Sequence, residues 1–272
     1  MAATGTKEWA ATTANCITGC EHRCLYCYAH AMASRFGRVH PEGWGHEVVN
    51  EKAAAKGYGK RKGSVMFPTT HDLTPANIEH TLPVLRRQLE AGNQVLVVSK
   101  PHPDVIDKIT TELEAYKAQV LFRFTIGSVS VRTLAFWEPG APGPLDRMTS
   151  LSLAHSRGWR TSVSMEPLLE VIEDRVVAMV ETLAPLVTVD IWVGKLNKGE
   201  ERLRKNGHWG DMAKRALRHL ENSQSDKRIR ALVARLDSHP LVVWKESIKA
   251  VVGESTRNTA DDSWAREPGS TD

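Results

Sequence analysis

The sequence predicts an α/β fold built on a parallel sheet, because short β-branched runs alternate along the chain with amphipathic helical stretches. Apolar residues recur at helical spacing in 78–89 and again in 105–116, which predicts two helices whose apolar stripes are core. The predicted strands are 64–67, 94–99, 120–126, 161–165 and 189–193, with a weak strand at 14–17 before them and a further one at 241–244.

Composition places the chain among ordinary globular proteins, with 272 residues, 41% hydrophobic and 25% charged. No apolar run of a secretory signal occurs in 1–15, and charged residues and a proline interrupt the longest apolar stretch. We therefore expect no contact with a membrane and a cytoplasmic location. The expected parts are a core over 1–200, a C-terminal extension of helices and a strand over 201–252, and a flexible acidic tail over 253–272.

The most informative motif is a set of three cysteines, Cys20, Cys24 and Cys27, separated by three and then two residues. An iron-sulfur cubane normally takes four thiolates, so three of them leave one iron open for another ligand. A zinc site of these cysteines with His22 or His30 is the alternative, but structural zinc usually draws on two separated ligand pairs. The fourth cysteine, Cys16, is expected to be an unligated thiol.

The segment from Gly19 to Tyr28, with Tyr26 before the last cysteine, resembles the signature of the radical S-adenosylmethionine (SAM) superfamily. This resemblance implies a [4Fe-4S] cluster whose open iron binds SAM, and a 5'-deoxyadenosyl radical that abstracts hydrogen from the substrate. It also implies a partial (β/α)6 TIM-like barrel with a C-terminal helical extension, and a reductant such as flavodoxin or ferredoxin as partner.

Active sites of parallel barrels lie at the carboxyl ends of the strands, so residues that follow each strand are candidates for binding the cofactor. Thr69, Thr70 and Asp72 follow the strand at 64–67, and their oxygen atoms are acceptors for an ammonium group. The alternative is that they begin a turn or cap a helix.

The next strand ends in Ser99 and Lys100, which resembles the branch of the superfamily similar to spore photoproduct lyase, where a lysine at this place reaches the SAM carboxylate. An exposed lysine with a solvated head is the alternative. The later strands carry Arg123, Ser164 and Glu166, although a buried ion pair between Arg123 and Glu166 explains the same residues. The expected cofactor-binding set is Tyr26, Thr69, Thr70, Asp72, Ser99, Lys100, Arg123, Ser164, Glu166 and Lys195.

Basic residues gather in two segments of a chain whose formal net charge is +4. Residues 35–62 hold seven Lys or Arg against three Glu, and residues 198–230 hold ten against five acids. Such surfaces attract phosphate backbones, although solvated helices that bind nothing are often basic too. We expect a nucleic-acid base or nucleotide as substrate, contacted by Lys60, Arg61 and Lys62.

The resemblance extends over about residues 12–197 and is nearest to the lyase-like branch and its uncharacterised phage and bacterial relatives. In the lyase, a downstream cysteine returns a hydrogen atom to the product radical, but no cysteine follows Cys27 here. Cys16 and Tyr58 are the remaining candidates for that role, and base modification fits the missing donor better than photoproduct repair. Two alternatives stay open: the same chemistry on a peptide or small metabolite, and a zinc-stabilised nucleic-acid-binding module without catalysis.

Overall fold

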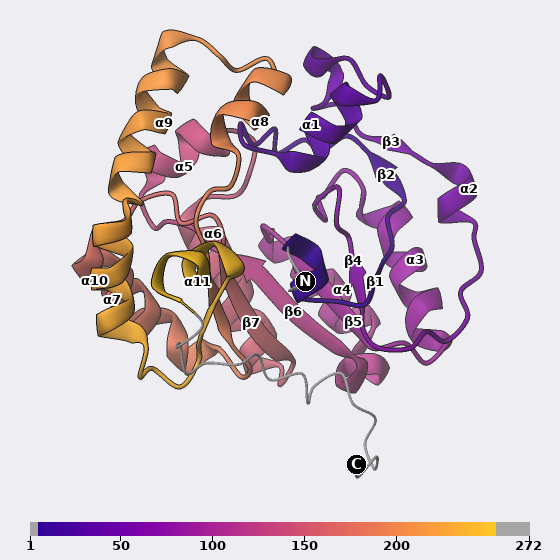
Figure 1. Ribbon diagram of the computed structural model, residues 1–272. Helices are drawn as coiled ribbons and strands as arrows, with labels where there is room; N and C mark the ends of the chain where they lie inside the picture. The colour runs from indigo at the N-terminus through magenta and orange to yellow at the C-terminus, as the bar shows by residue number, and fades with distance from the viewer. Residues whose placement is uncertain (1–4, 254–272) are drawn as a thin grey trace.

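The computed structural model describes residues 5–253, and its centre is a seven-stranded parallel sheet (Figure 1). In spatial order its strands are β1 (Thr12–Thr13), β4 (Val65–Phe67), β5 (Val95–Ser99), β6 (Val120–Thr125), β7 (Arg160–Met165), β8 (Ile191–Val193) and β9 (Val242–Trp244). The strands follow one another in chain order and every neighbouring pair is parallel, as in a (β/α) barrel that is left open between its first and last strands. The predicted partial barrel is confirmed.

A small antiparallel sheet of β2 (Ile17–Thr18) and β3 (Val48–Val49) lies beside the main one. Of the weak strand predicted at 14–17, only Ile17 belongs to a strand, β2, whereas the first strand of the main sheet is β1 at Thr12–Thr13. The helices are α1 (Tyr28–Arg35), α2 (Glu51–Ala54), α3 (Ile78–Glu90), α4 (Pro103–Glu112), α5 (Val131–Trp137), α6 (Pro144–Ser156), α7 (Glu173–Leu183), α8 (Gly199–Lys205), α9 (Asp211–Ser223), α10 (Asp226–Leu236) and α11 (Glu246–Val252). Short 3-10 turns occupy η1 (Gly5–Glu8), η2 (Pro41–Gly43), η3 (Glu114–Gln119) and η4 (Ala184–Leu186).

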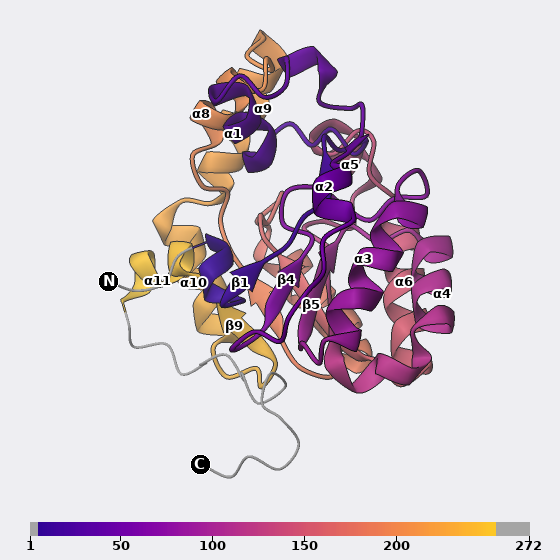
Figure 2. The same ribbon diagram turned by 90° about the vertical axis from the view of Figure 1, so that its right-hand side faces the viewer.

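The two faces of the sheet are buried against different partners, because alternate residues of a strand point to opposite sides. Val97, Phe122 and their neighbours on the outer face form the main core with the helices, and Figure 2 shows α3, α4 and α6 side by side there. On the inner face, Leu96 and Leu121 pack against Trp9 and its neighbours. The N-terminal segment thus fills part of the barrel interior.

Two buried cations lie in that interior. Arg123 is bonded to both carboxylate oxygens of Asp190 at 2.9 and 3.0 Å and to Ser162 at 2.8 Å. Lys245 pairs with Glu8 at 2.9 Å and with Glu166 at 3.3 Å. Arg123 and Glu166, considered as a pair from the sequence, therefore have different partners, because Asp190 and Lys245 arrive from strands farther along the sheet.

The C-terminal extension expected over 201–252 supplies a strand to the main sheet, since β9 pairs with β8. The boundary at residue 200 and the separate status of that part stay predictions. Apart from Gly253, the predicted tail over 253–272 lies outside the described residues. Among the helices that the structure describes, none is long and apolar enough to cross a membrane.

We expect Asp190→Asn to lower the free energy of unfolding by about 3 kcal/mol, because it leaves the buried Arg123 guanidinium without its counter-charge. Urea denaturation followed by circular dichroism measures the change. The matched control is Asp107→Asn, which breaks the more exposed ion pair with Arg157 and should cost less than about 1 kcal/mol. Equal changes in the free energy of unfolding would show that the buried ion pair stabilises the fold no more than the exposed one.

Candidate active site

A cavity of about 940 Å³ lies at the carboxyl ends of the strands and reaches α1 and α8. The residues that follow β4, β5, β7 and β8 contribute Asp72, Lys100, Glu166 and Lys195 to its lining. Seven members of the cofactor-binding set expected from the sequence line it: Tyr26, Thr69, Thr70, Asp72, Lys100, Glu166 and Lys195.

All three cysteines of the motif line this cavity, on a loop between β2 and α1 that runs from Gly19. Gly19 has φ +94°, and a Cβ there would lie 2.3 Å from the carbonyl oxygen of His46, so the start of the loop requires glycine. The Cys27 thiol ends the loop by accepting the His30 amide at 3.4 Å, at the beginning of α1.

Contacts from distant parts of the chain hold the loop in place. The side-chain amide of Asn206, after α8, donates to the carbonyl oxygens of Leu25 at 2.9 Å and Cys27 at 3.0 Å. The Gly140 amide donates to the carbonyl of His22 at 3.0 Å, and a Cβ on Gly140 would lie 2.1 Å from the carbonyl oxygen of Glu21. The cysteine loop is thus fixed by residues more than a hundred positions away in sequence.

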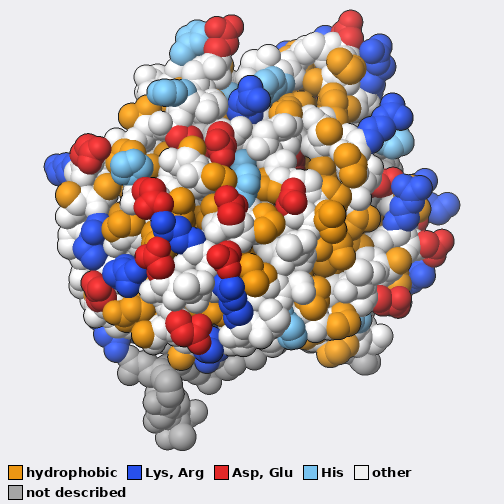
Figure 3. All heavy atoms as spheres, turned by 180° about the vertical axis from the view of Figure 1, so that it is seen from behind, with side chains coloured by type: hydrophobic (Ala, Val, Ile, Leu, Met, Phe, Trp, Pro, Cys, Tyr) orange, Lys and Arg blue, Asp and Glu red, His pale blue; other side chains and the backbone are white. Residues whose placement is uncertain are grey.

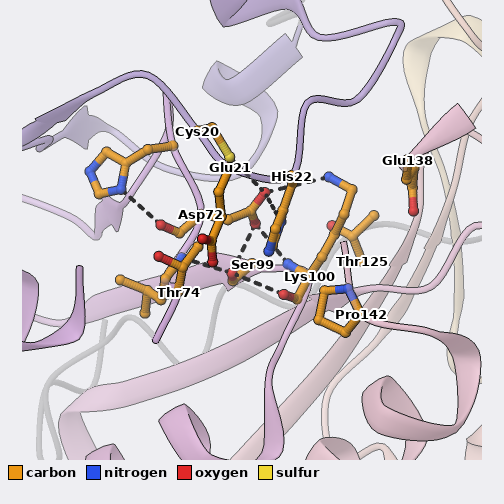
Figure 4. A network of polar contacts seen from close by, with 12 residues as sticks. Cys20, Glu21, His22, Asp72, Thr74, Ser99, Lys100, Thr125, Glu138 and Pro142 are labelled. Atoms are coloured by element: carbon orange, nitrogen blue, oxygen red, sulfur yellow. Dashed lines mark hydrogen bonds and ion pairs between the residues drawn. The ribbon is translucent and has the colours of Figure 1, made fainter. Parts of the chain in front are cut away.

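Asp72 is the centre of the polar network beside the cysteines (Figure 4). One carboxylate oxygen accepts the Ser99 hydroxyl at 2.8 Å and the Lys100 amide at 2.7 Å, and the other lies 2.9 Å from His22 Nδ1 and 3.7 Å from Lys100 Nζ. Burial alone raises the pKa of Asp72, but the charge of Lys100 and the bond to His22 hold that pKa well below its usual value. Asp72 is therefore an anion.

Lys100 keeps its proton although it is largely buried. Burial lowers its pKa, but Asp72 and other nearby acidic groups raise it well above the usual value. Its ammonium lies 6.0 Å from the ring centre of Tyr26, whose hydroxyl donates to Glu138. Glu138 in turn pairs with Arg147, and both side chains are fully buried. A fixed cation therefore faces the cavity beside the thiols.

Burial raises the pKa of all three thiols, and Lys100 offsets part of that rise at Cys24 and Cys27. Buried thiols of this kind ionise when a metal replaces the proton. A single zinc ion bound by three thiolates at about 2.3 Å would bring their sulfur atoms to about 3.8 Å from one another. Among the described residues, the groups whose ligand atoms all lie within 4.8 Å contain at most one of these cysteines. The spacing fits a larger cluster better than one ion.

Three residues expected to bind the cofactor lie behind the cavity wall instead. The Ser99 hydroxyl supports Asp72 and accepts the Leu73 amide at 3.0 Å. Arg123 is engaged by Asp190 and Ser162. Ser164 is fully buried, and its hydroxyl has no hydrogen-bond partner among the described residues. Alternation along β6 and β7 correctly predicted their inward direction, but the N-terminal segment occupies that part of the interior.

The other candidates lie elsewhere. Cys16 is in the core behind the cavity, where burial raises its pKa to about 12, and Tyr58 lies near it. Neither residue lines the cavity.

Lys60, Arg61 and Lys62 precede β4, and the Arg61 amide donates to Asn93, which precedes β5. These three basic residues are therefore at the amino ends of the strands, opposite the cavity.

Sequence reasoning missed several lining residues. Tyr28 directly follows Cys27, and the basic residues Arg35, Lys198, Arg202 and Lys205 come from α1 and the α8 region. The motif itself was a signal for Tyr28, and the basic segments 35–62 and 198–230 contain the other four. Nothing local pointed to Asn206 or Glu138, because their role depends on long-range contacts.

No family model matches the chain. A curated relative, the uncharacterized protein ORF301 of Acidianus two-tailed virus, is 29% identical over 166 residues, which cover 57% of this chain and 54% of the relative. The chain thus spans about half the length of the curated relative that it matches.

Solved structures share the fold. A mutant of spore photoproduct lyase with a dinucleoside spore photoproduct has a TM-score of 0.54 at 14% identity, covering 85% of this chain and 75% of the lyase. SuiB from Streptococcus suis bound to S-adenosylmethionine has a TM-score of 0.50 at 10% identity, covering 89% of this chain and 52% of SuiB. SuiB bound to its precursor peptide SuiA gives a TM-score of 0.51. Both proteins are radical SAM enzymes, and the likeness confirms the fold that the resemblance implied.

We expect Asn206→Ala to lower the free energy of unfolding by about 2 kcal/mol, because two carbonyl oxygens of the cysteine loop lose their donor. Hydrogen exchange of the backbone amides in residues 24–30 should also be faster than in the wild type. Urea denaturation and hydrogen-exchange mass spectrometry measure the two effects. The control is Asn222→Ala on the exposed side of α9, and similar behaviour of both variants would contradict the anchoring role of Asn206.

Proposed function

We propose that this chain is a radical SAM enzyme that carries a [4Fe-4S] cluster on Cys20, Cys24 and Cys27. The observation that carries the proposal is the cavity at the carboxyl ends of the strands, where the three thiols meet the ion pair of Lys100 and Asp72. When bound, the cluster and SAM supply the radical that abstracts hydrogen from the substrate.

The side chains around the thiols have separate tasks in this proposal. Lys100 binds the carboxylate of SAM, since its proton is retained and its ammonium faces the cavity. Asp72 orients Lys100 through the backbone amide and the ion pair. Thr69 and Thr70 offer hydroxyl oxygens to the SAM ammonium, and Asn15 fixes their position by accepting both backbone amides, at 2.7 and 2.9 Å.

On the far side of the cavity, Glu166 is the acceptor for ribose hydroxyls. Burial raises its pKa and Lys245, at 3.3 Å, opposes that rise. Apolar and aromatic side chains, including Tyr26, Met66 and Val98, line the rest and keep water from the reacting atoms. A reductant such as flavodoxin or ferredoxin, and a cytoplasmic location, belong to the same proposal.

The charge of the cavity mouth favours an anionic substrate. Arg35, Lys198, Arg202 and Lys205 line it from α1 and the α8 region, and we call these four residues the basic rim. Phe36 is 57% exposed beside them, with the guanidinium groups of Arg35 and Arg38 within 5.6 Å of its ring centre. Cations beside an exposed ring are the elements that bind single-stranded nucleic acid.

Seen from behind the view of Figure 1, the molecule mixes acidic and basic side chains over its described residues (Figure 3). Because Lys60, Arg61 and Lys62 lie at the amino ends of the strands, away from the cavity, the basic rim replaces them as the proposed contact with a nucleic-acid base or nucleotide. A peptide or small metabolite is the competing substrate class. A zinc-stabilised module without catalysis is the competing class of protein.

After anaerobic reconstitution with iron and sulfide and reduction with dithionite, we expect the wild type to bind about four irons and convert SAM to 5'-deoxyadenosine. Cys24→Ala should lose both the iron and the product. Iron analysis and chromatography measure them. Cys16→Ala is the matched control and should retain both, because Cys16 is outside the cavity. Stoichiometric zinc in place of iron would favour the non-catalytic module.

Replacing Arg35, Lys198 and Lys205 of the basic rim by glutamine should weaken binding of a single-stranded oligonucleotide at least about tenfold at low salt. The slope of log K against log salt should become shallower by about 2, since three phosphate contacts are lost. Fluorescence anisotropy over a salt series measures both quantities. The same replacement of Lys60, Arg61 and Lys62 is the control, and an effect confined to that control would move the binding surface to the other end of the barrel.

A further inference from the structure

Beyond the cysteines, one group of side chains has the composition and geometry of a metal site. Among the described residues, Glu21, His22 and His102 each offer one ligand atom, and these atoms all lie within 4.8 Å of one another. Glu21 and His22 belong to the cysteine loop, whereas His102 lies between β5 and α4. The three residues therefore come from two separate segments that meet only in the fold.

His22 is oriented as a ligand. Its Nδ1 lies 2.9 Å from a carboxylate oxygen of Asp72, and this contact fixes the orientation of the ring. A carboxylate that holds the second ring nitrogen is the usual partner of a metal-binding histidine. The side chain of His22 is fully buried, and its Nε2 points at Nε2 of His102, 2.9 Å away.

His102 and Glu21 are also placed so that their side chains can face His22. The His102 side chain makes no capping bond to the helix that follows it, so its ring is available to His22. The backbone amide of Glu21 fastens this part of the loop by donating to the Glu47 carboxylate at 3.1 Å, so the loop is held here without the Glu21 carboxylate. Gly140 holds the backbone beside the two ligands through the carbonyl of His22.

A second cavity gives access from outside. It has a volume of about 520 Å³ and is lined by Glu21, Arg23, Glu42, Gly45, His46 and Gly140. The lining of the cysteine cavity, by contrast, contains none of the three proposed ligands among the described residues. Of the three proposed ligands, Glu21 alone lines this second cavity among the described residues, so the proposed site is open to solvent on the Glu21 side.

A simple hydrogen bond between the two imidazole rings is the competing explanation of the short contact. A zinc ion with Zn–N distances of about 2.0–2.1 Å needs the two nitrogen atoms about 3.3 Å apart, so replacing the shared proton by the metal requires a shift of only a few tenths of an ångström. The half-buried Glu21 has no role in the hydrogen-bond explanation. As a third ligand, its carboxylate has one.

We propose that Glu21, His22 and His102 bind a divalent transition metal, with zinc the best fit to two imidazoles and one carboxylate. The ion fastens the cysteine loop to the connection between β5 and α4, and so holds the loop against the strand ends. This site is separate from the proposed cluster and does not depend on the proposed function.

The test uses protein reconstituted anaerobically with iron and sulfide, so that the cysteines are occupied, and then washed with EDTA. Zinc is titrated against a chromophoric chelator, and zinc and iron are both counted by mass spectrometry. We expect the wild type to bind one zinc per chain, and His102→Ala to bind it at least about 100-fold more weakly, beyond the usual loss for an outer partner. Bound zinc should also raise the unfolding temperature of the wild type but not of this variant.

Glu21→Gln keeps the shape of the side chain but removes the anionic ligand, so it should also weaken zinc binding by more than about 100-fold, the upper limit for an outer partner, which protects the test if His102→Ala folds poorly. The matched control is His80→Ala, an exposed histidine on α3, and it should bind zinc like the wild type. Zinc bound equally by wild type, His102→Ala and Glu21→Gln, or not bound by the wild type, overturns the proposal. Loss of iron with zinc binding intact would count against the proposed function alone.

Discussion

The arrangement of the candidate site depends on one buried ion pair, between Asp72 after β4 and Lys100 after β5. Asp72 also binds the Ser99 hydroxyl, the Lys100 amide and the ring of His22, so a single carboxylate connects two strand ends with the cysteine loop. A buried charge is tolerated only when it is paired and hydrogen-bonded. Losing any one of these contacts would leave a buried charge or polar group without its partner, so the contacts of Asp72 stabilise one another.

A second buried pair has the same function on the other side of the loop. Glu138 and Arg147 are fully buried, and Glu138 accepts the hydroxyl of Tyr26, which stands between two of the cysteines. Asn206 completes the support by binding the carbonyl oxygens of Leu25 and Cys27. Three thiols of raised pKa are thus held in a rigid pocket, which is the condition for binding a cluster without rearranging the chain.

The two parts of the cavity have different side chains. The thiols, Lys100 and Asp72 lie at the strand ends, while the basic rim lies on α1 and α8 at the mouth. In the proposed function the inner part holds the cofactor and the rim selects an anionic substrate. The outer side of the same loop presents Glu21 and His22 to His102, so the loop serves one proposed site on each side.

The sequence by itself determined the parallel α/β sheet and the cysteine motif, because alternating hydrophobic periods and ligand spacing are local properties. It also indicated that Asp72 and Lys100 lie near each other, since residues that follow parallel strands converge at one edge, while their role in binding a cofactor stays a prediction. Only the tertiary structure decided that Arg123 pairs with Asp190, that Lys60–Lys62 lie at the opposite end, and that Asn206 and His102 reach the cysteine loop. These outcomes depend on which side chains meet across long separations, and no local pattern encodes such contacts.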